Sequence, residues 1–224
     1  MKKTLSVILG VIGMGVAQAS NSNEEQQLQH EPLITLQYGI MHSECQESID
    51  AIQYVPSVLY GFSLGCQWKL AETESLNHYV GLNIGYYTGS QTDIYYGSEK
   101  TTDVDVIPLL LTYNMEYQLN DKLCVYGGIR GGAIIRDTSM NYKRYGESFN
   151  DTSVNPMLGV GIGARAWISD NWAFDVGYDF SFAFGEDCEL GAPNEYLLDT
   201  SDKCSSPHNA RYYGTIKVGF SYSF

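Results

Sequence analysis

Residues 172–184 read Trp-Ala-Phe-Asp-Val-Gly-Tyr-Asp-Phe-Ser-Phe-Ala-Phe, and this stretch decides the fold. Large apolar side chains occupy every second position from Trp172 to Phe184, while small or polar residues such as Asp175 and Asp179 stand between them. Strict alternation of this kind is typical of a β-strand with one apolar and one polar face. At roughly 3.3 Å per residue, about 10 tilted residues cross the hydrocarbon layer of a membrane, so the stretch is long enough to span it.

The C-terminal stretch repeats this alternation and ends on an aromatic residue. The apolar positions of its second half are Ile216, Val218, Phe220, Tyr222 and Phe224. This ending resembles the strand by which the outer-membrane assembly machinery recognises its barrel substrates. We therefore expect these five residues to form an assembly signal.

Six further segments follow the same template, at residues 33–41, 58–70, 77–88, 105–118, 122–135 and 156–168. The connections between segments alternate between short and long, and the long ones span residues 42–57, 89–104, 136–155 and 185–210. Short periplasmic turns and long outer loops are typical of a transmembrane barrel. The pattern is compatible with eight or ten strands, and we predict an all-β, eight-stranded antiparallel up-and-down transmembrane β-barrel with four long outer loops and short periplasmic turns.

Aromatic residues near the predicted strand ends fit interfacial girdles. They are Trp68, Trp167, Trp172, Tyr60, Tyr86 and Tyr113. The alternative interpretation is the core of a soluble barrel.

The N-terminus has the pattern of a secretory signal peptide. Lys2 and Lys3 precede an uncharged apolar core, and an Ala-x-Ala site predicts cleavage between Ala19 and Ser20. We therefore expect a signal peptide at residues 1–19, a disordered polar leader at 20–32 and the outer-membrane β-barrel at 33–224. The formal net charge of −13 argues against a nucleic-acid-binding surface.

Five cysteines in an exported chain predict at least one disulfide. Cys188 and Cys204 lie in one polar segment and are the predicted pair. The pairing of Cys45, Cys66 and Cys124 stays open, although Cys66 and Cys124 fall inside predicted strands, where a cysteine is typically a small buried apolar side chain.

Taken together, the strand count, the alternation and the C-terminal ending resemble the OmpA/OmpX-type superfamily of small outer-membrane barrels, over roughly residues 33–224. The resemblance implies the outer membrane of a Gram-negative bacterium. It also implies a monomer whose partners are outer-membrane lipid, lipopolysaccharide and, during biogenesis, the assembly machinery.

The inward faces of the predicted strands carry three acids and three bases. The lumen of an eight-stranded barrel is just wide enough to be filled by side chains. The short turn after Ile168 places Arg165 opposite Asp175, with Lys217 on the next strand, and predicts a cross-strand ion pair. We expect either a permanent polar core, which we favour, or a gate of exchanging ion pairs, formed by Glu116, Arg130, Arg165, Asp175, Asp179 and Lys217.

The sequence gives little support to catalysis or metal binding. His42 and Ser43 stand beside Glu44 without the spacing of a nucleophile and its base. No metal site and no cofactor are expected. Residues 185–206 carry a formal net charge of −5, which suits cation bridges to lipopolysaccharide or an extracellular ligand at the loops. We predict a non-enzymatic structural or surface-interaction role; the alternatives are a narrow pore for small solutes or ions and a lipid A-modifying enzyme.

Overall fold

The computed structural model describes residues 32–45, 58–73, 75–95, 98–143, 147–185 and 210–224. The predicted signal peptide with its Ala19–Ser20 cleavage site and the predicted Cys188–Cys204 pair lie outside these residues. The described residues form eight strands: β1 Leu33–Cys45, β2 Val58–Glu72, β3 Leu76–Tyr95, β4 Ser98–Asn120, β5 Leu123–Tyr142, β6 Glu147–Trp167, β7 Trp172–Phe184 and β8 Ala210–Ser223.

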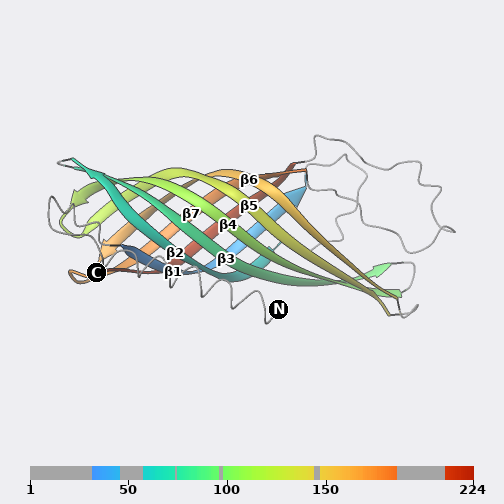
Figure 1. Cartoon of the computed structure of the whole chain (residues 1–224). Coiled ribbons are helices and arrows are strands. Elements are labelled where there is room, and N and C mark those ends of the chain that lie inside the picture. Colours follow the sequence, from blue (N-terminus) through green and yellow to red (C-terminus); the bar gives the residue numbers. More distant parts are fainter. Residues whose placement is uncertain (1–31, 46–57, 74, 96–97, 144–146, 186–209) are drawn as a thin grey trace. The chain divides into compact units, whose positions relative to one another are not determined.

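Each strand pairs antiparallel with the next in the chain, and β8 pairs with β1 to close the ring (Figure 1). The seam between the two ends of the sheet runs from Leu33 opposite Ser223 to Cys45 opposite Arg211. Closure satisfies the edge N–H and C=O groups that an open sheet would leave unpaired. The prediction of an eight-stranded antiparallel barrel is confirmed.

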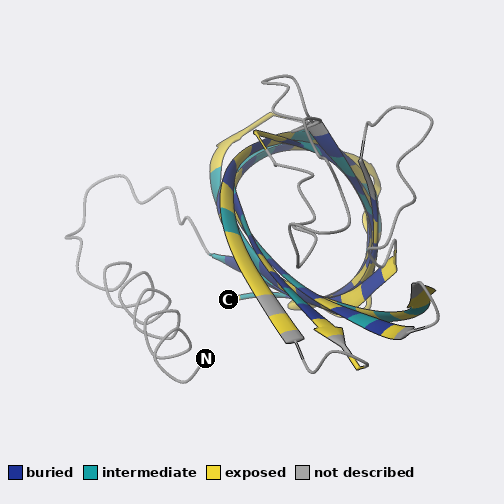
Figure 2. Cartoon of the chain, turned by 90° about the vertical axis from the view of Figure 1, so that its right-hand side faces the viewer, coloured by how far each residue is buried: buried dark blue, intermediate teal, exposed yellow. Residues whose placement is uncertain are grey.

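Side chains alternate across the wall as the sequence pattern requires. On β7, Phe174, Val176 and Tyr178 point outward and are exposed, whereas Asp175 and Asp179 point into the barrel and are buried. The same two-residue period runs around the ring in Figure 2. The polar face therefore lines the lumen and the apolar face covers the outside.

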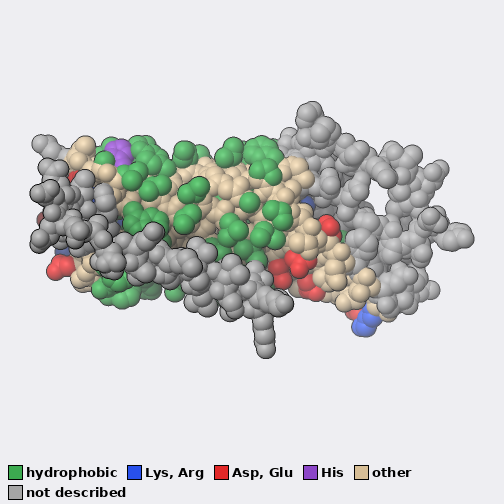
Figure 3. Space-filling model, viewed as in Figure 1, with side chains coloured by type: hydrophobic (Ala, Val, Ile, Leu, Met, Phe, Trp, Pro, Cys, Tyr) green, Lys and Arg blue, Asp and Glu red, His purple; other side chains and the backbone are tan. Residues whose placement is uncertain are grey.

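The outside of the barrel carries a broad apolar band, visible over its middle and its short-turn end (Figure 3). Exposed apolar surface of this extent marks an interaction with another apolar phase, here lipid. The described residues contain no helix long and apolar enough to cross a membrane. Members of the band are Leu36, Ile40, Phe62, Leu82, Leu111, Ile129, Leu158, Ile162, Phe174, Ile216 and Phe220.

Aromatic side chains on β7 and β8 form contacting pairs near the short-turn end. The ring centroids of Trp172 and Tyr222 lie 4.9 Å apart, as do those of Tyr222 and Phe224. Tyr60 and Tyr86 are exposed on the outer face. The predicted girdle position of Trp167 is wrong. Trp167 lies two residues after Arg165 on β6, so both side chains are on the lumen-facing side of the strand.

Strands β3 to β6 are longer than the rest, at 20–23 residues against 13–15 for the other four. The β3 pairing with β2 stops at Thr88, and the β6 pairing with β7 starts at Met157. Beyond these points β3 to β6 continue as a four-stranded sheet, which we call the extension and define as residues 89–95, 98–104, 136–142 and 147–156.

The prediction of long loops at residues 89–104 and 136–155 is therefore wrong. In these stretches most residues are polar at odd and at even positions alike, so the stretches lack the continuous apolar face by which a strand is recognised in a sequence. Outside the lipid a strand needs no apolar face, and ladder hydrogen bonds with β-branched residues such as Thr101, Thr102 and Val104 are sufficient.

Side-chain caps fix two of the short turns. Asn120 Oδ1 accepts the amide hydrogens of Lys122 and Leu123 at 2.9 and 3.0 Å between β4 and β5. Between β6 and β7, Asn171 Nδ2 donates to the Ser223 carbonyl at 2.8 Å, and the Ser223 amide donates to the Asn171 carbonyl at 2.9 Å. This reciprocal pair ties the turn to the end of β8.

Candidate functional site in the barrel lumen

The lumen holds two layers of side chains. An ionic layer lies toward the short turns, and an apolar layer lies toward the long connections. All six charged residues predicted to face inward belong to the ionic layer and are at most 7% exposed.

The part of the ionic layer nearest the short turns is centred on Arg165. Its Nε donates to Asp175 Oδ1 at 3.0 Å, and its Nη1 donates to Glu116. The second oxygen of Asp175 accepts from the hydroxyl of Ser221. The guanidinium carbon also lies 5.5 Å from the centroid of the Tyr126 ring. One cation is thus held by two carboxylates and an aromatic face.

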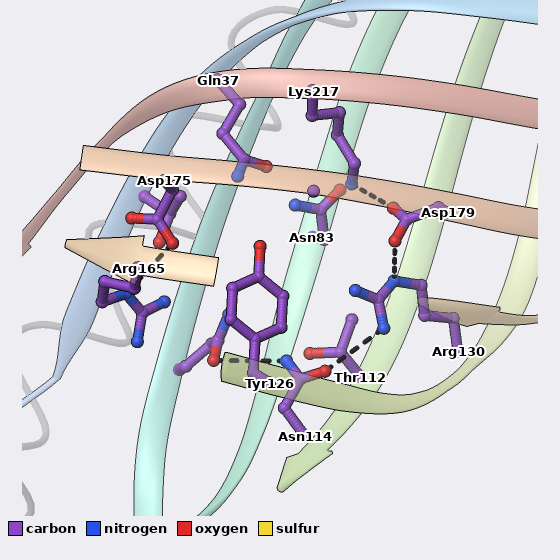
Figure 4. A pocket seen from close by; sticks show the side chains of 13 residues that line it. Gln37, Asn83, Thr112, Asn114, Tyr126, Arg130, Arg165, Asp175, Asp179 and Lys217 are labelled. Carbon is purple, nitrogen blue, oxygen red and sulfur yellow. Dashed lines mark hydrogen bonds and ion pairs between the residues drawn. The ribbon is translucent and has the colours of Figure 1, made fainter. Parts of the chain in front are cut away.

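The second part of the ionic layer has the opposite composition and is centred on Asp179. Arg130 Nε lies 2.7 Å from Asp179 Oδ1, and Lys217 Nζ pairs with the other carboxylate oxygen. Arg130 Nη1 donates to Asn114 Oδ1 at 3.2 Å, and Asn114 Nδ2 donates to Gln67 at 3.3 Å (Figure 4). Two cations share one carboxylate here, so the whole layer has three positive and three negative groups.

Glycines on β6 make room for these side chains. A Cβ atom on Gly161 would lie 2.2 Å from Asp179 Oδ1 and 2.3 Å from the Arg130 guanidinium carbon. Gly161 faces Asp179 directly in the β6–β7 ladder. The small residues of this strand therefore serve the ion pairs as much as the curvature of the wall.

A cavity of about 30 Å³ lies between the two parts of the ionic layer. It exceeds the roughly 10–15 Å³ that a water molecule needs, and its walls are polar, so it suits ordered water. The cavity has room for isolated water molecules. Its lining is Thr35, Gln37, Gln67, Asn83, Thr112, Asn114, Tyr126, Arg130, Arg165, Asp175, Gly177, Asp179 and Lys217.

The apolar layer fills the lumen toward the long connections. Its members are buried and in mutual contact, and Leu59, Val106 and Ile134 have no exposed surface. The set is Met41, Leu59, Tyr87, Val104, Val106, Leu110, Ile134, Met157, Ala183 and Tyr213.

The structure brings the six predicted charged residues together. Arg165 lies opposite Asp175, as the turn after Ile168 predicts, and Lys217 on the next strand pairs with Asp179. Sequence reasoning missed the neutral members of the network and the whole apolar layer. The two-residue period of a strand was enough to find both groups, since Asn114 and Leu110 lie on the same face of β4 as Glu116.

Other candidate residues lie apart from this site. His42 is exposed and Ser43 is buried, so the two lie on opposite faces of β1 and cannot act together. Cys66 and Cys124 are free thiols, and Cys124 is buried. Within the described ranges, no group of three or more His, Cys, Asp or Glu residues is placed to hold a metal. The C-terminal residues Ile216, Val218, Phe220 and Tyr222 lie on the outward side of β8, and the exposed Phe224 directly follows the strand.

Two charged sites lie in or beside the extension, outside the apolar band. Lys143 Nζ is 2.6 Å from Glu99 Oε2, and this partner lowers the pKa of Glu99 and raises that of Lys143. Lys100 is buried, and its pKa is lowered by burial, with the nearby Asp93 acting in the opposite direction. These groups are distinct from the lumen network.

Comparison with known proteins gives the family. The model of the outer membrane protein beta-barrel domain matches residues 6–224. Outer membrane protein A of Serratia marcescens is 29% identical over 126 residues, which are 54% of this chain and 34% of that protein, so this chain spans about a third of that relative.

Among solved structures, Ail, the attachment invasion locus protein of Yersinia pestis, in complex with the heparin analogue sucrose octasulfate, is similar at 14% identity and a TM-score of 0.48. The match covers 87% of this chain and 99% of that one. The outer membrane protease OmpT from Escherichia coli is similar at 9% identity and a TM-score of 0.48, over 91% and 99% of the two chains. The match of the family model over residues 6–224 shows that this protein belongs to the outer membrane protein beta-barrel domain family of the bacterial outer membrane.

Proposed function

We propose that this protein is a non-enzymatic outer-membrane barrel with a structural and surface-interaction role, and that its lumen is a permanent core. The observation that carries the proposal is the stacking of two filled layers in one lumen. A solute would have to part the ion pairs of Asp179 and Arg165 and then displace the apolar layer.

Energetics supports a fixed network. Removing one partner of a buried ion pair typically costs about 3–5 kcal/mol, because the remaining charge stays buried. Asp179 has two cationic partners and Arg165 has two anionic partners, so opening either part breaks two pairs. Exchange of partners would need a vacant charge, and the balanced set of three acids and three bases supplies none.

The extension supports the surface-interaction role. It projects beyond the rim that β1, β2, β7 and β8 define, and its outer face carries the exposed acids Glu99, Asp103 and Asp137. Carboxylates on a rigid sheet suit contacts with divalent cations or with cationic groups on neighbouring molecules. We propose outer-membrane lipid and lipopolysaccharide as the immediate neighbours of the barrel.

Single-channel recording in planar bilayers tests the permanent core. We expect no discrete conductance steps from the refolded mature protein. The matched variants are Asp179→Asn, which leaves two buried cations unpaired, and Asp170→Asn, which changes an exposed turn residue. Steps in the wild-type protein that change in amplitude with Asp179→Asn alone would support the narrow pore instead.

The enzymatic alternative has its own test. Lipid A from vesicles that contain the refolded protein is expected to keep its mass. A mass change that His42→Ala abolishes would overturn the non-enzymatic proposal.

A further inference from the structure

The hydrogen-bonded wall of the barrel is interrupted at one place within the apolar band. Between β3 and β4, Ile84 pairs with Leu109 and Tyr87 pairs with Val106, but the two pairs between them are missing. The register is the same on both sides of the gap, so this is not a bulge. The other irregularities in the described ladders lie at the short turns, between Lys69 and Ala71 and between Gln118 and Asn120.

Pro108 accounts for the gap. Its position is opposite Gly85, and proline has no amide hydrogen to donate across the ladder. Pro108 keeps its pairing with Ile134 on the other side, as Pro156 on β6 keeps its pairing with Ala133. Pro156 differs in its place, because the β6–β7 ladder begins only at Met157 and Pro156 lies beside a free edge, so it leaves no gap inside a ladder.

The inner side of the gap faces the apolar layer, and the Pro108 ring lies against Gly85 there, since a Cβ on this glycine would be 3.0 Å from Pro108 Cγ. Val106 and Leu110 flank Pro108 on the lumen face of β4. The Tyr87 ring lies across Gly85 and extends to Gly39 on β1, because a Cβ on either glycine would lie within 3.0 Å of that ring. The absence of side chains at the two glycines thus makes room for the Tyr87 ring, and movement of this ring would leave an apolar space behind it.

The outer side of the gap faces lipid near the end of the barrel toward the long connections. Leu82, Leu109 and Leu111 are exposed in the apolar band around it. Just beyond the gap, the Tyr86 hydroxyl donates to Asp105 at 2.8 Å, which marks the polar boundary of the band. The outer part of the apolar band and the apolar layer of the lumen thus lie on opposite sides of the gap.

We propose that the wall between β3 and β4 at Gly85 and Pro108 is a lateral portal. Through it, a small apolar molecule such as an aliphatic chain passes from the outer leaflet into the apolar layer, and Tyr87 moves aside to admit it. Apolar side chains predominate on both sides, with the buried Arg136 opposite Val106 on the lumen side, whereas the axial route contains paired charges. The portal goes beyond the proposed function and leaves the axial closure intact.

Photolabelling of the refolded mature protein in phosphatidylcholine vesicles tests the portal. The probe is a medium-chain alcohol that carries a diazirine, and mass spectrometry locates the labelled residues. We expect labelling of the inward residues Tyr87 and Leu110 in addition to the lipid-facing Ile129 and Ile162. Labelling confined to outward residues would overturn the proposal.

Restoring the missing amide should close the portal. Pro108→Val is expected to reduce inward labelling about fivefold, the ratio that corresponds to one net hydrogen bond, and to leave outward labelling unchanged. Pro156→Val, at a proline beside a free edge, should change neither. Equal inward labelling in Pro108→Val and the wild type would show that the gap is not the route.

An engineered disulfide between β3 and β4 gives a test that does not depend on the folding of Pro108→Val. Tyr86 and Ile107 face outward at opposite positions of the gap, so Tyr86→Cys with Ile107→Cys can be oxidised to lock β3 to β4. Inward labelling should disappear on oxidation and return on reduction. Inward labelling that persists in the oxidised protein would refute the portal.

Discussion

Arg165 and Asp175 lie directly opposite each other in the β6–β7 ladder, with Arg165 Nε 3.0 Å from Asp175 Oδ1. Both side chains are buried in the lumen, at 2% and 0% exposed. The contact joins two adjacent strands through their polar faces. The polar side chains of the lumen therefore contribute to the stability of the barrel.

Asp179→Asn should destabilise the barrel more than any exposed acid-to-amide change. It leaves Arg130 and Lys217 buried without their shared carboxylate, at a cost of about 3–5 kcal/mol in the free energy of unfolding. Urea titration in lipid vesicles, followed by tryptophan fluorescence, measures this cost. Asp170→Asn is the control and should shift the free energy by less than about 0.5 kcal/mol; equal shifts would show that the network contributes nothing.

Two adjacent glycines on β5 should differ in their response to substitution by alanine. A Cβ on Gly128 would lie 2.0 Å from the Tyr113 carbonyl oxygen, whereas the nearest atom to a Cβ on Gly127 is 3.7 Å away. Gly128→Ala should cost about 1–3 kcal/mol through overpacking, and Gly127→Ala should be close to neutral. The fraction of heat-modifiable folded band on a gel, measured over a urea series, separates the two; similar curves would contradict the close contact.

Asn171→Ala should loosen the end of β8. The substitution removes the hydrogen bond from Asn171 Nδ2 to the Ser223 carbonyl, and a typical net contribution of such a bond is about 1 kcal/mol. Amide exchange of β8 should become faster near Ser223 and stay unchanged near Ile216. Asp121→Asn, at an exposed position in the β4–β5 turn, is the control, and equal effects of both variants would rule out a specific clasp.

The Glu99–Lys143 pair should make the tip of the extension sensitive to pH. The pKa of Glu99 is lowered from its ordinary value of 4.5 in the folded protein, so the contribution of the pair is present above that value and is lost as the pH falls through the lowered pKa. The raised pKa of Lys143 sets the alkaline limit in the opposite sense, above its ordinary 10.5.

Carbon-13 NMR titration of the Glu99 carboxylate measures this effect directly. Lys143→Met should return the pKa of Glu99 toward its ordinary value, and Lys122→Met, in a turn at the other end of the barrel, should leave it unchanged. An unchanged pKa in Lys143→Met would show that the contact does not persist in solution.

The barrel was predictable because lipid on one side and a filled lumen on the other impose a strict two-residue period. That period places Phe174 outside and Asp175 inside without any knowledge of the fold. The extension escaped prediction because its strands are polar on both faces, as at Thr101 and Thr102. There the ladder hydrogen bonds decide the structure, and they leave no mark on the hydropathy of the sequence.

The lumen network was predictable only in part. The turn after Ile168 fixes the register that sets Arg165 against Asp175, because few residues intervene. The pairing of Asp179 with Arg130 and Lys217 depends on side-chain length and on the space above Gly161. The two-residue period gives the face of the strand on which a residue lies. It does not give how far the charged end of the side chain reaches along the barrel axis.

The seam at which Leu33 faces Ser223 makes the stability of every strand depend on the presence of β8. Without β8 in place, β1 and β7 would each keep an open row of N–H and C=O groups that lipid cannot satisfy. A barrel that lacks β8 therefore has no stable arrangement in the bilayer and stays available to proteases. Stable insertion is coupled to closure of the ring by geometry alone.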